Sequence, residues 1–242
     1  TAATEQPPEV DVTLDDGVVH RFWVVRDQAC QEQITALVDA MEALYIADGH
    51  HRSAAAARVA EQRGEACEGA GYFLSVLFSD AAVQIFDYNR VVTDLQGLTA
   101  AEFVDAVAEI FELQLEATQV RPGASGEFGM YLEGQWYRLK VPASKIPAED
   151  PVARLDVSLL HGLLIEPVLG ISDPRRDKRV DFVGGIRGLD ELERRVDSGE
   201  MAVAFSLYPT TLEALMSVAD AGEVMPPKST WFEPKLADGM AS

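Results

Sequence analysis

Residues 45–60 read YIADGHHRSAAAARVA, a stretch that places an Asp, a Gly, two His and an Arg at the end of a short apolar run. That run, residues 43–47, is too short for a helix and is bounded by Asp48 and Gly49, which predicts a buried strand followed by a tight turn. The alanine-rich residues that follow predict a helix from residue 51 or 52 to residue 63. The stretch is therefore expected to form a strand, a turn and a helix N-terminus.

A helix that begins at such a turn presents unpaired backbone N–H groups and the positive end of its dipole, an arrangement that binds anions. Gly49 allows a backbone conformation that a side chain would hinder, and it lets a ligand approach closely. Arg52 can hold phosphate oxygens through two hydrogen bonds. His50 and His51 can donate further hydrogen bonds or move a proton, and Ser53 adds a hydroxyl. The pattern predicts a phosphate-binding turn.

Two other interpretations of the same residues stay open. In one, Asp48 caps the helix and both histidines are solvated. In the other, the site binds a metal, although His50 and His51 point about 100° apart at a helix start and can hardly bind one ion together. Asp48 with one histidine could still hold a cation that a phosphate bridges, as magnesium is usually bound.

The composition limits the classes of partner. The 242 residues include 20 basic and 40 acidic side chains, a formal net charge of -20, which disfavours nucleic acid and anionic membranes as partners. An anionic ligand would need a local basic pocket. No apolar run reaches the roughly 18 residues of a membrane helix, and the first residues lack the features of a signal peptide. A soluble, cytoplasmic protein is expected.

The remaining pattern mixes helices with strands and shows no long internal repeat. Strands are expected at 18–25, within hairpins at 72–92 and 128–141, and at 179–183 and 201–209; helices are expected at 26–42, 99–113, 157–169, 189–196 and 210–221. The helix at 99–113 begins with a capping box formed by Thr99 and Glu102. These elements predict an α+β fold with mixed sheets, hairpins and packed helices.

Three side chains with reactive groups are expected to be ordinary core residues. Cys30 and Cys67 are far apart and have no CxxC partner, so buried thiols are favoured over a disulfide or a zinc site. His161 lies on an apolar helix, which favours a core histidine with satisfied hydrogen bonds.

A second candidate site is the segment GEVMPPKST, residues 222–230, which is similar to a phosphate-binding P-loop. Pro227 stands where the second glycine of that loop would be, and it lacks the N–H that the loop needs. A P-loop is therefore excluded. Lys228 and Lys235 could still contribute to an anion pocket; alternatively, the segment closes the domain by packing Trp231 and Phe232.

A third candidate is the basic run Arg175–Arg179, which stands out in so acidic a chain. Gly184 and Gly185 follow it and could form another anion-binding turn. A solvated loop whose arginines pair with the nearby Asp173 and Asp177 is the alternative.

Much of the chain resembles the C-terminal part of the domain of unknown function 1015 family. The shared segments include YNRVV, GEFGMYL, DPVARLDVSLL, DKRVDFVGGIRGLDELERRVDSGEMAVAFSLYPT and MPPKSTWFEPKL. The string IADGHHRSAAAARVA is also similar to a segment of the ParB and sulfiredoxin-like fold, and free serine kinases of that superfamily carry a DGHHR segment. The resemblance implies that the chain is a piece of a longer protein, whose own N-terminal part would be a partner.

With this resemblance, the expected organisation is a linker or loose segment at 1–16, a ParB-like phosphate-binding portion at 17–98 and a C-terminal α+β portion at 99–242. The kinase resemblance implies that the phosphate ligands are Gly49, His50, His51, Arg52 and Ser53, joined by Lys228. It makes Asp48 a metal-binding or catalytic residue and His50 a second catalytic candidate. The catalytic base stays unassigned.

These features predict a nucleotide- or phosphate-binding protein, specifically a small-molecule phosphotransferase linked to serine metabolism. Its ligand would be a nucleotide such as ATP, with Mg²⁺, or another small anion. A non-enzymatic nucleotide-binding regulatory module and a metal-assisted phosphatase are the alternatives, and a homo-oligomer is left open.

Overall fold

The computed structural model describes residues 4–15, 17–67 and 69–235, which belong to two compact units. The first unit contains the chain up to Leu77 together with the segment from Pro234 onward. The second unit comprises Phe78–Glu233. The division therefore falls about twenty residues before the expected boundary at residue 98, because the strand at residues 88–92 lies inside the sheet of the second unit.

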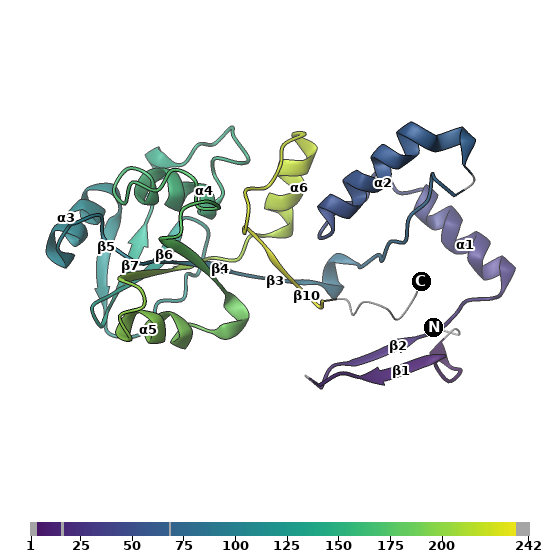
Figure 1. Ribbon diagram of the computed structural model, residues 1–242, viewed down its shortest axis with the longest axis horizontal. Helices are drawn as coiled ribbons and strands as arrows, with labels where there is room; N and C mark the ends of the chain where they lie inside the picture. Colours follow the sequence, from purple (N-terminus) through teal and green to yellow (C-terminus); the bar gives the residue numbers. More distant parts are fainter. Residues whose placement is uncertain (1–3, 16, 68, 236–242) are drawn as a thin grey trace. The chain divides into compact units, whose positions relative to one another are not determined.

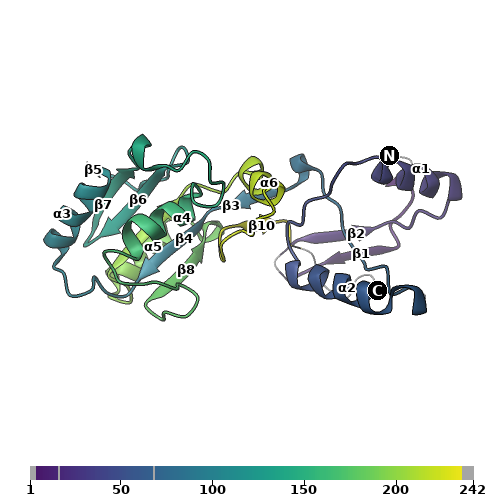
Figure 2. The ribbon, with the colours of Figure 1, turned by 90° about the horizontal axis from the view of Figure 1, so that it is seen from above.

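A six-stranded antiparallel sheet forms the centre of the second unit (Figures 1 and 2). Its strand order is β5-β7-β6-β9-β4-β8, and every neighbouring pair is antiparallel. The strands are β4 (Tyr88–Val92), β5 (Glu112–Glu116), β6 (Glu127–Leu132), β7 (Gln135–Lys140), β8 (Val180–Gly184) and β9 (Val203–Leu207). The α+β prediction is confirmed, with antiparallel pairing throughout this sheet.

Both faces of the sheet are covered, because successive residues of a strand point to opposite faces. Val92 and Met130 belong to the larger apolar core, whereas their neighbours Val91 and Tyr131 belong to the smaller one. Helices cover the two faces. The larger core receives side chains from α3 (Ala100–Ile110), α4 (Asp156–Leu160), the π-helix His161–Ile165 and α6 (Leu212–Asp220). The smaller core receives side chains from α5 (Asp190–Asp197).

Local sequence signals set several of these elements. Thr99 and Glu102 form the predicted capping box, in which each side chain accepts a hydrogen bond from the other residue's backbone N–H. Between β6 and β7 the chain turns at Glu133 and Gly134, whose φ angles are 46° and 77°. Two positive φ angles match the twist of a two-residue hairpin turn. The predicted hairpin is confirmed.

Other predictions in this unit are wrong. The helix expected at 99–113 ends at Ile110, and the residues expected to form its last turn belong instead to the start of β5. No hairpin forms within residues 72–92, because β3 (Gln84–Phe86) pairs with β10 (Trp231–Glu233) while β4 pairs with β8 and β9. Strand β10 is a short strand at residues for which the sequence predicted no element.

The first unit contains the hairpin of β1 (Val10–Thr13) and β2 (Val19–Phe22) and the helices α1 (Gln28–Asp39) and α2 (His50–Arg63). The side chain of Asp27 accepts a hydrogen bond from the backbone N–H of Cys30, so Asp27 caps α1. Strand β1 lies within the segment expected to be loose. Short 3-10 turns occur in the two units at Gly64–Ala66, Asp80–Ala82, Ala143–Lys145 and Gly185–Arg187.

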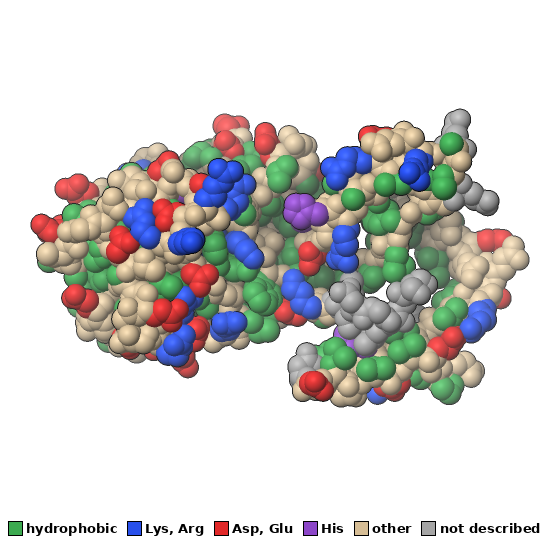
Figure 3. All heavy atoms as spheres, in the orientation of Figure 1, with side chains coloured by type: hydrophobic (Ala, Val, Ile, Leu, Met, Phe, Trp, Pro, Cys, Tyr) green, Lys and Arg blue, Asp and Glu red, His purple; other side chains and the backbone are tan. Residues whose placement is uncertain are grey.

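Apolar side chains of the first unit remain at the surface (Figure 3). None of the described side chains from residue 4 to residue 86 is buried. The expected buried strand at 43–47 is therefore wrong: Leu44 and Ile46 are 54% and 48% exposed, and the segment pairs with no described strand. The buried-thiol prediction fails for the same reason, since Cys67 is exposed and Cys30 is only half-buried.

An ionisable side chain, Asp156, is buried where α4 begins. One oxygen, Oδ1, accepts hydrogen bonds from Ser125 Oγ at 2.6 Å and from the Gly126 N–H at 2.8 Å. The other oxygen, Oδ2, is buried without a partner among the described residues. Burial raises the pKa of Asp156 to about 6, and the two hydrogen bonds only partly oppose that rise.

We expect Asp156 to make folding pH-dependent. Because its pKa is higher in the folded state than in the unfolded chain, its carboxyl group becomes destabilising as the pH rises from about 4 to about 6. Relative to D156N, the ionised carboxyl group should lower the free energy of unfolding by about 3 kcal/mol at neutral pH. Urea unfolding of both proteins at several pH values measures this difference. The exposed-site variant D105N serves as the control, and parallel pH profiles of wild type and D156N would contradict the assignment.

Candidate functional site

The DGHHR segment forms a turn that opens helix α2. Gly49 is the N-cap and has a φ of 81°, in the left-handed region that favours glycine. The Ser53 N–H donates to the Gly49 carbonyl at 2.9 Å, which closes the first helical turn. Within the described part of the chain, no side-chain hydrogen bond caps the helix. The predicted turn and helix start are present, and the N–H groups of the first turn have no side-chain acceptor among the described residues.

Asp48 does not act as the helix cap, because the N-cap is Gly49. Its Oδ1 accepts a hydrogen bond from the Gly49 N–H at 2.7 Å. Its Oδ2 accepts one from Lys235 Nζ at 3.4 Å. The Gly49 hydrogen bond is the largest cause that lowers the pKa of Asp48, and the charges of Lys235 and Arg52 lower it further. Asp48 is therefore an ionised carboxylate at neutral pH.

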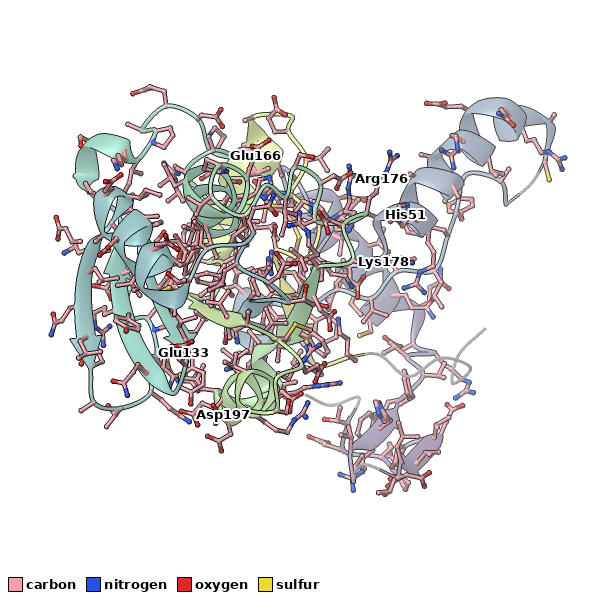
Figure 4. All side chains as sticks on the ribbon, turned by 60° about the vertical axis from the view of Figure 1, so that its left-hand side comes forward. His51, Glu133, Glu166, Arg176, Lys178 and Asp197 are labelled. Carbon is pink, nitrogen blue, oxygen red and sulfur yellow. The ribbon has the colours of Figure 1, made fainter. Side chains whose placement is uncertain are left out.

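Arg52 lies over the turn. A Cβ placed on Gly49 would be 3.5 Å from both Nε and Nη2 of Arg52, so the guanidinium packs beside the backbone of the N-cap. His50 and His51 occupy the first two helical positions and are exposed, and His51 projects from the start of α2 in Figure 4. Ser53 is half-buried one turn into the helix.

Lys235 is a functional candidate that the motif alone does not reveal. It lies 187 residues after Asp48 in the sequence, yet the structure places its ammonium group against that carboxylate. The sequence indicated Lys235 only as a possible contributor, with Lys228, to an anion pocket, and not as a neighbour of Asp48. The described residues contain no group of three or more His, Cys, Asp or Glu side chains arranged to hold a metal ion.

Lys228 lies in the second unit, on the loop between α6 and β10. This loop is followed by strand β10 and not by the helix that a P-loop requires. Its backbone is held by Arg90 Nη2, which donates to the Lys228 carbonyl at 2.8 Å. Trp231 packs against Tyr88 with 5.6 Å between ring centroids, and Phe232 is buried, so the tail closes the second unit.

The basic run before β8 is a paired surface loop. Arg175 bonds to Asp173, and Arg179 bonds to Asp177 as well as to the Leu169 carbonyl. The alternative of arginines that pair with nearby carboxylates is therefore confirmed. Arg176, labelled in Figure 4 with Lys178, is the most exposed of the paired arginines in the run.

The glycine pair at the end of β8, Gly184 and Gly185, allows close packing. A Cβ on Gly184 would lie 2.6 Å from the ring of Trp231, and one on Gly185 would lie 2.0 Å from Asp87 Oδ1. A carboxylate at this distance opposes the binding of an anion, so the glycines are explained by packing. His161 differs from a satisfied core histidine, because its Nδ1 is buried without a partner among the described residues while the side chain is 26% exposed.

Comparison with family models matches residues 1–158 to the family "Protein of unknown function (DUF1015)". The chain belongs to this family. The matched range includes the DGHHR turn, YNRVV and the DPVARLDVSLL segment up to Ser158. A search of curated proteins found no match to this DUF1015 protein.

Several solved structures are distantly similar. A mutant free serine kinase in complex with AMP is 17% identical, with 85% of this chain and 78% of that chain covered and a TM-score of 0.40. A conserved hypothetical protein from Pyrococcus furiosus is 16% identical over 85% and 81% of the two chains, with a TM-score of 0.42. A mutant free serine kinase with ADP is 18% identical over 85% and 78%, with a TM-score of 0.39.

None of the described helices has the length and hydrophobicity that crossing a bilayer would require.

We expect G185A to destabilise the second unit, because its new methyl group would collide with the buried Asp87 carboxylate. Overpacking of this kind costs about 1–3 kcal/mol. The control is G162A, where nothing lies within 4 Å of the added Cβ and the helical position favours alanine. Thermal unfolding followed by circular dichroism measures both. Equal stability of the two variants would contradict the packing explanation.

Proposed function

We propose that the DGHHR turn binds the phosphate groups of a nucleotide and that the protein is a small-molecule phosphotransferase of the free serine kinase type. The observation that supports the proposal most directly is the uncapped N-terminus of α2 at Gly49, where cationic side chains gather. Arg52 packs over the turn, and Lys235 reaches it from the far end of the sequence. In a chain of net charge -20, such a local gathering of cations is suited to an anion.

The turn offers three kinds of donor to a phosphate. The backbone N–H groups of the first helical turn point along the helix axis toward the ligand. Arg52 can give two parallel hydrogen bonds to phosphate oxygens, and His50 and His51 can each give one. Lys235 adds a positive point charge. When a phosphate binds, its ammonium group would give up part of its contact with Asp48 and contact the phosphate.

Asp48 fits the proposed Mg²⁺ only as one carboxylate that shares the ion with bound phosphates. Mg²⁺ is commonly held by one or two carboxylates together with substrate phosphates and waters, so one ionised Asp48 meets that requirement. When bound, the ion would neutralise phosphate charge. Asp48 is a poor general base at neutral pH because its pKa is lowered, so we assign it to ion binding or to positioning of the substrate hydroxyl. His50 stays a candidate for moving the proton.

The second candidate function is a non-enzymatic module that binds a nucleotide and changes how the protein assembles. The pairing of Asp48 with Lys235 favours it, because a carboxylate neutralised by a lysine is less available for catalysis. The exposed apolar side chains of the first unit, such as Leu44 and Ile46, leave surface for a further protein segment or a second copy. The expected N-terminal partner and a homo-oligomer stay predictions.

We expect R52A to weaken nucleotide binding. Loss of hydrogen bonds from a charged donor costs about 1.5–3 kcal/mol, which corresponds to roughly a ten- to hundredfold rise in the Kd. Isothermal titration calorimetry with ADP and with ATP, each with Mg²⁺, measures it. The matched control is R58A, which removes an exposed arginine from the same helix beyond the turn. Equal Kd values for R52A and wild type would contradict the proposal that the DGHHR turn binds phosphate.

A turnover experiment separates the two functions. Wild type incubated with ATP, Mg²⁺ and serine should form ADP and phosphoserine, detected by chromatography. D48N should lower kcat while it retains nucleotide binding in the absence of Mg²⁺, because it removes a negative charge and no phosphate ligand. Binding without turnover in wild type would reject the kinase and favour the regulatory module. Release of phosphate from phosphoserine without a nucleotide would instead indicate the phosphatase.

A further inference from the structure

Arg90 is a buried cation in the middle of strand β4. The residue is 5% exposed, although arginine is almost never buried without a partner. Two aromatic rings flank it: the guanidinium carbon Cζ is 4.7 Å from the ring centroid of Phe182 and 5.9 Å from that of Tyr88. These cation–π contacts stabilise the charge, but they supply no hydrogen-bond acceptor.

The hydrogen bonds of Arg90 leave donors available. A guanidinium has five N–H groups. In the part of the chain that the structure describes, Nη1 donates to the Tyr88 carbonyl and Nη2 donates to the Lys228 carbonyl. No described carboxylate forms an ion pair with Arg90, although acidic residues outnumber basic ones 40 to 20 in the sequence. A buried charge without a counter-ion is unfavourable, so an external anion would relieve it.

A second cation contacts the same aromatic ring. The Lys228 ammonium nitrogen is 5.5 Å from the centroid of the Tyr88 ring, so Lys228 and Arg90 share one aromatic neighbour. Lys228 is an exposed residue, so solvent and ligands can reach it.

The loop that carries Lys228 is tied down by three hydrogen bonds. Arg90 holds the Lys228 carbonyl, Thr210 Oγ1 donates to the Ser229 carbonyl at 3.0 Å, and Ser229 Oγ donates to the Pro226 carbonyl at 2.6 Å. Lys228 itself has a φ of 57°. The loop therefore holds the lysine backbone beside Tyr88.

We propose that Arg90 and Lys228 form an oxyanion-binding site on the second unit, beside Tyr88, that accepts a carboxylate or phosphate group. The ligand would enter from the side of Lys228, whose ammonium group pairs with one oxygen. The free N–H groups of Arg90 would donate to another oxygen, since a guanidinium matches the geometry of both oxyanions. The site uses no residue of the DGHHR turn and does not depend on the function proposed for that turn.

Trp231 provides the reporter, because its ring packs on Tyr88. The chain has three tryptophans, and the W231F variant identifies the indole N–H signal of Trp231 in a proton–nitrogen NMR spectrum. Sodium phosphate and sodium acetate are titrated separately into the full chain, with chloride adjusted to keep the ionic strength constant. A saturable shift of the Trp231 signal is expected. Saturation with phosphate alone, with acetate alone or with both supports the site and identifies which oxyanion it takes.

Two lysine variants make the test specific. K228Q should weaken the apparent affinity roughly tenfold, the effect of losing one charge-assisted hydrogen bond. K140Q removes an exposed lysine from strand β7 and should leave the affinity unchanged. Because Lys228 is exposed, K228Q should fold normally, which a circular dichroism spectrum checks. R90K retains the positive charge but lacks the planar guanidinium group, and it should weaken binding further if it folds.

The outcomes are distinct. No saturable shift with either anion, or equal affinities of K228Q and wild type, would overturn the site. The R52A protein should give the same Trp231 titration as wild type. If R52A abolished the response, the signal would report the DGHHR turn, and an independent site on the second unit would be rejected. Loss of nucleotide binding in R52A with an unchanged Trp231 titration would support both sites separately.

Discussion

Strand β4 must fill two cores and pair with two strands at once, and the second unit is organised around that constraint. Its pairing with β8 and β9 leaves four of its five residues buried, from Asn89 to Val92. Arg90 is the charged member of this group. Because its guanidinium donates to the Lys228 carbonyl, burial of one cation in the sheet also positions a loop 138 residues later. Burial lowers the pKa of Arg90 to about 9, so it remains charged at neutral pH.

The two units obtain their polar sites in different ways. In the first unit, a glycine with a positive φ and an uncapped helix start come from five consecutive residues, and Lys235 is a distant residue that contacts Asp48. In the second unit, strand pairing and aromatic packing bring Arg90, Tyr88 and Lys228 together. The first kind of site depends on local backbone conformation, whereas the second depends on the folded sheet.

Prediction from the sequence succeeded where the interaction is short in range. The capping box at Thr99 and the turn at Gly134 each depend on residues within three positions of each other. It failed for the apolar segment at residues 43–47, which has the composition of a buried strand but pairs with no described strand. Apolar composition indicates that a segment can be buried, but a strand also needs a neighbour, and the neighbour is not encoded locally.

The sequence by itself determined the α+β class, the capping box at Thr99, and the turn that opens α2, because each follows from local backbone preference and hydrophobic periodicity. Only the tertiary structure decided that β3 pairs with β10, that Gly185 must make room for Asp87, and that Lys235 reaches Asp48. The physical reason is that these contacts join residues far apart in the chain, and their partners are selected by packing of the whole unit and not by spacing along the sequence.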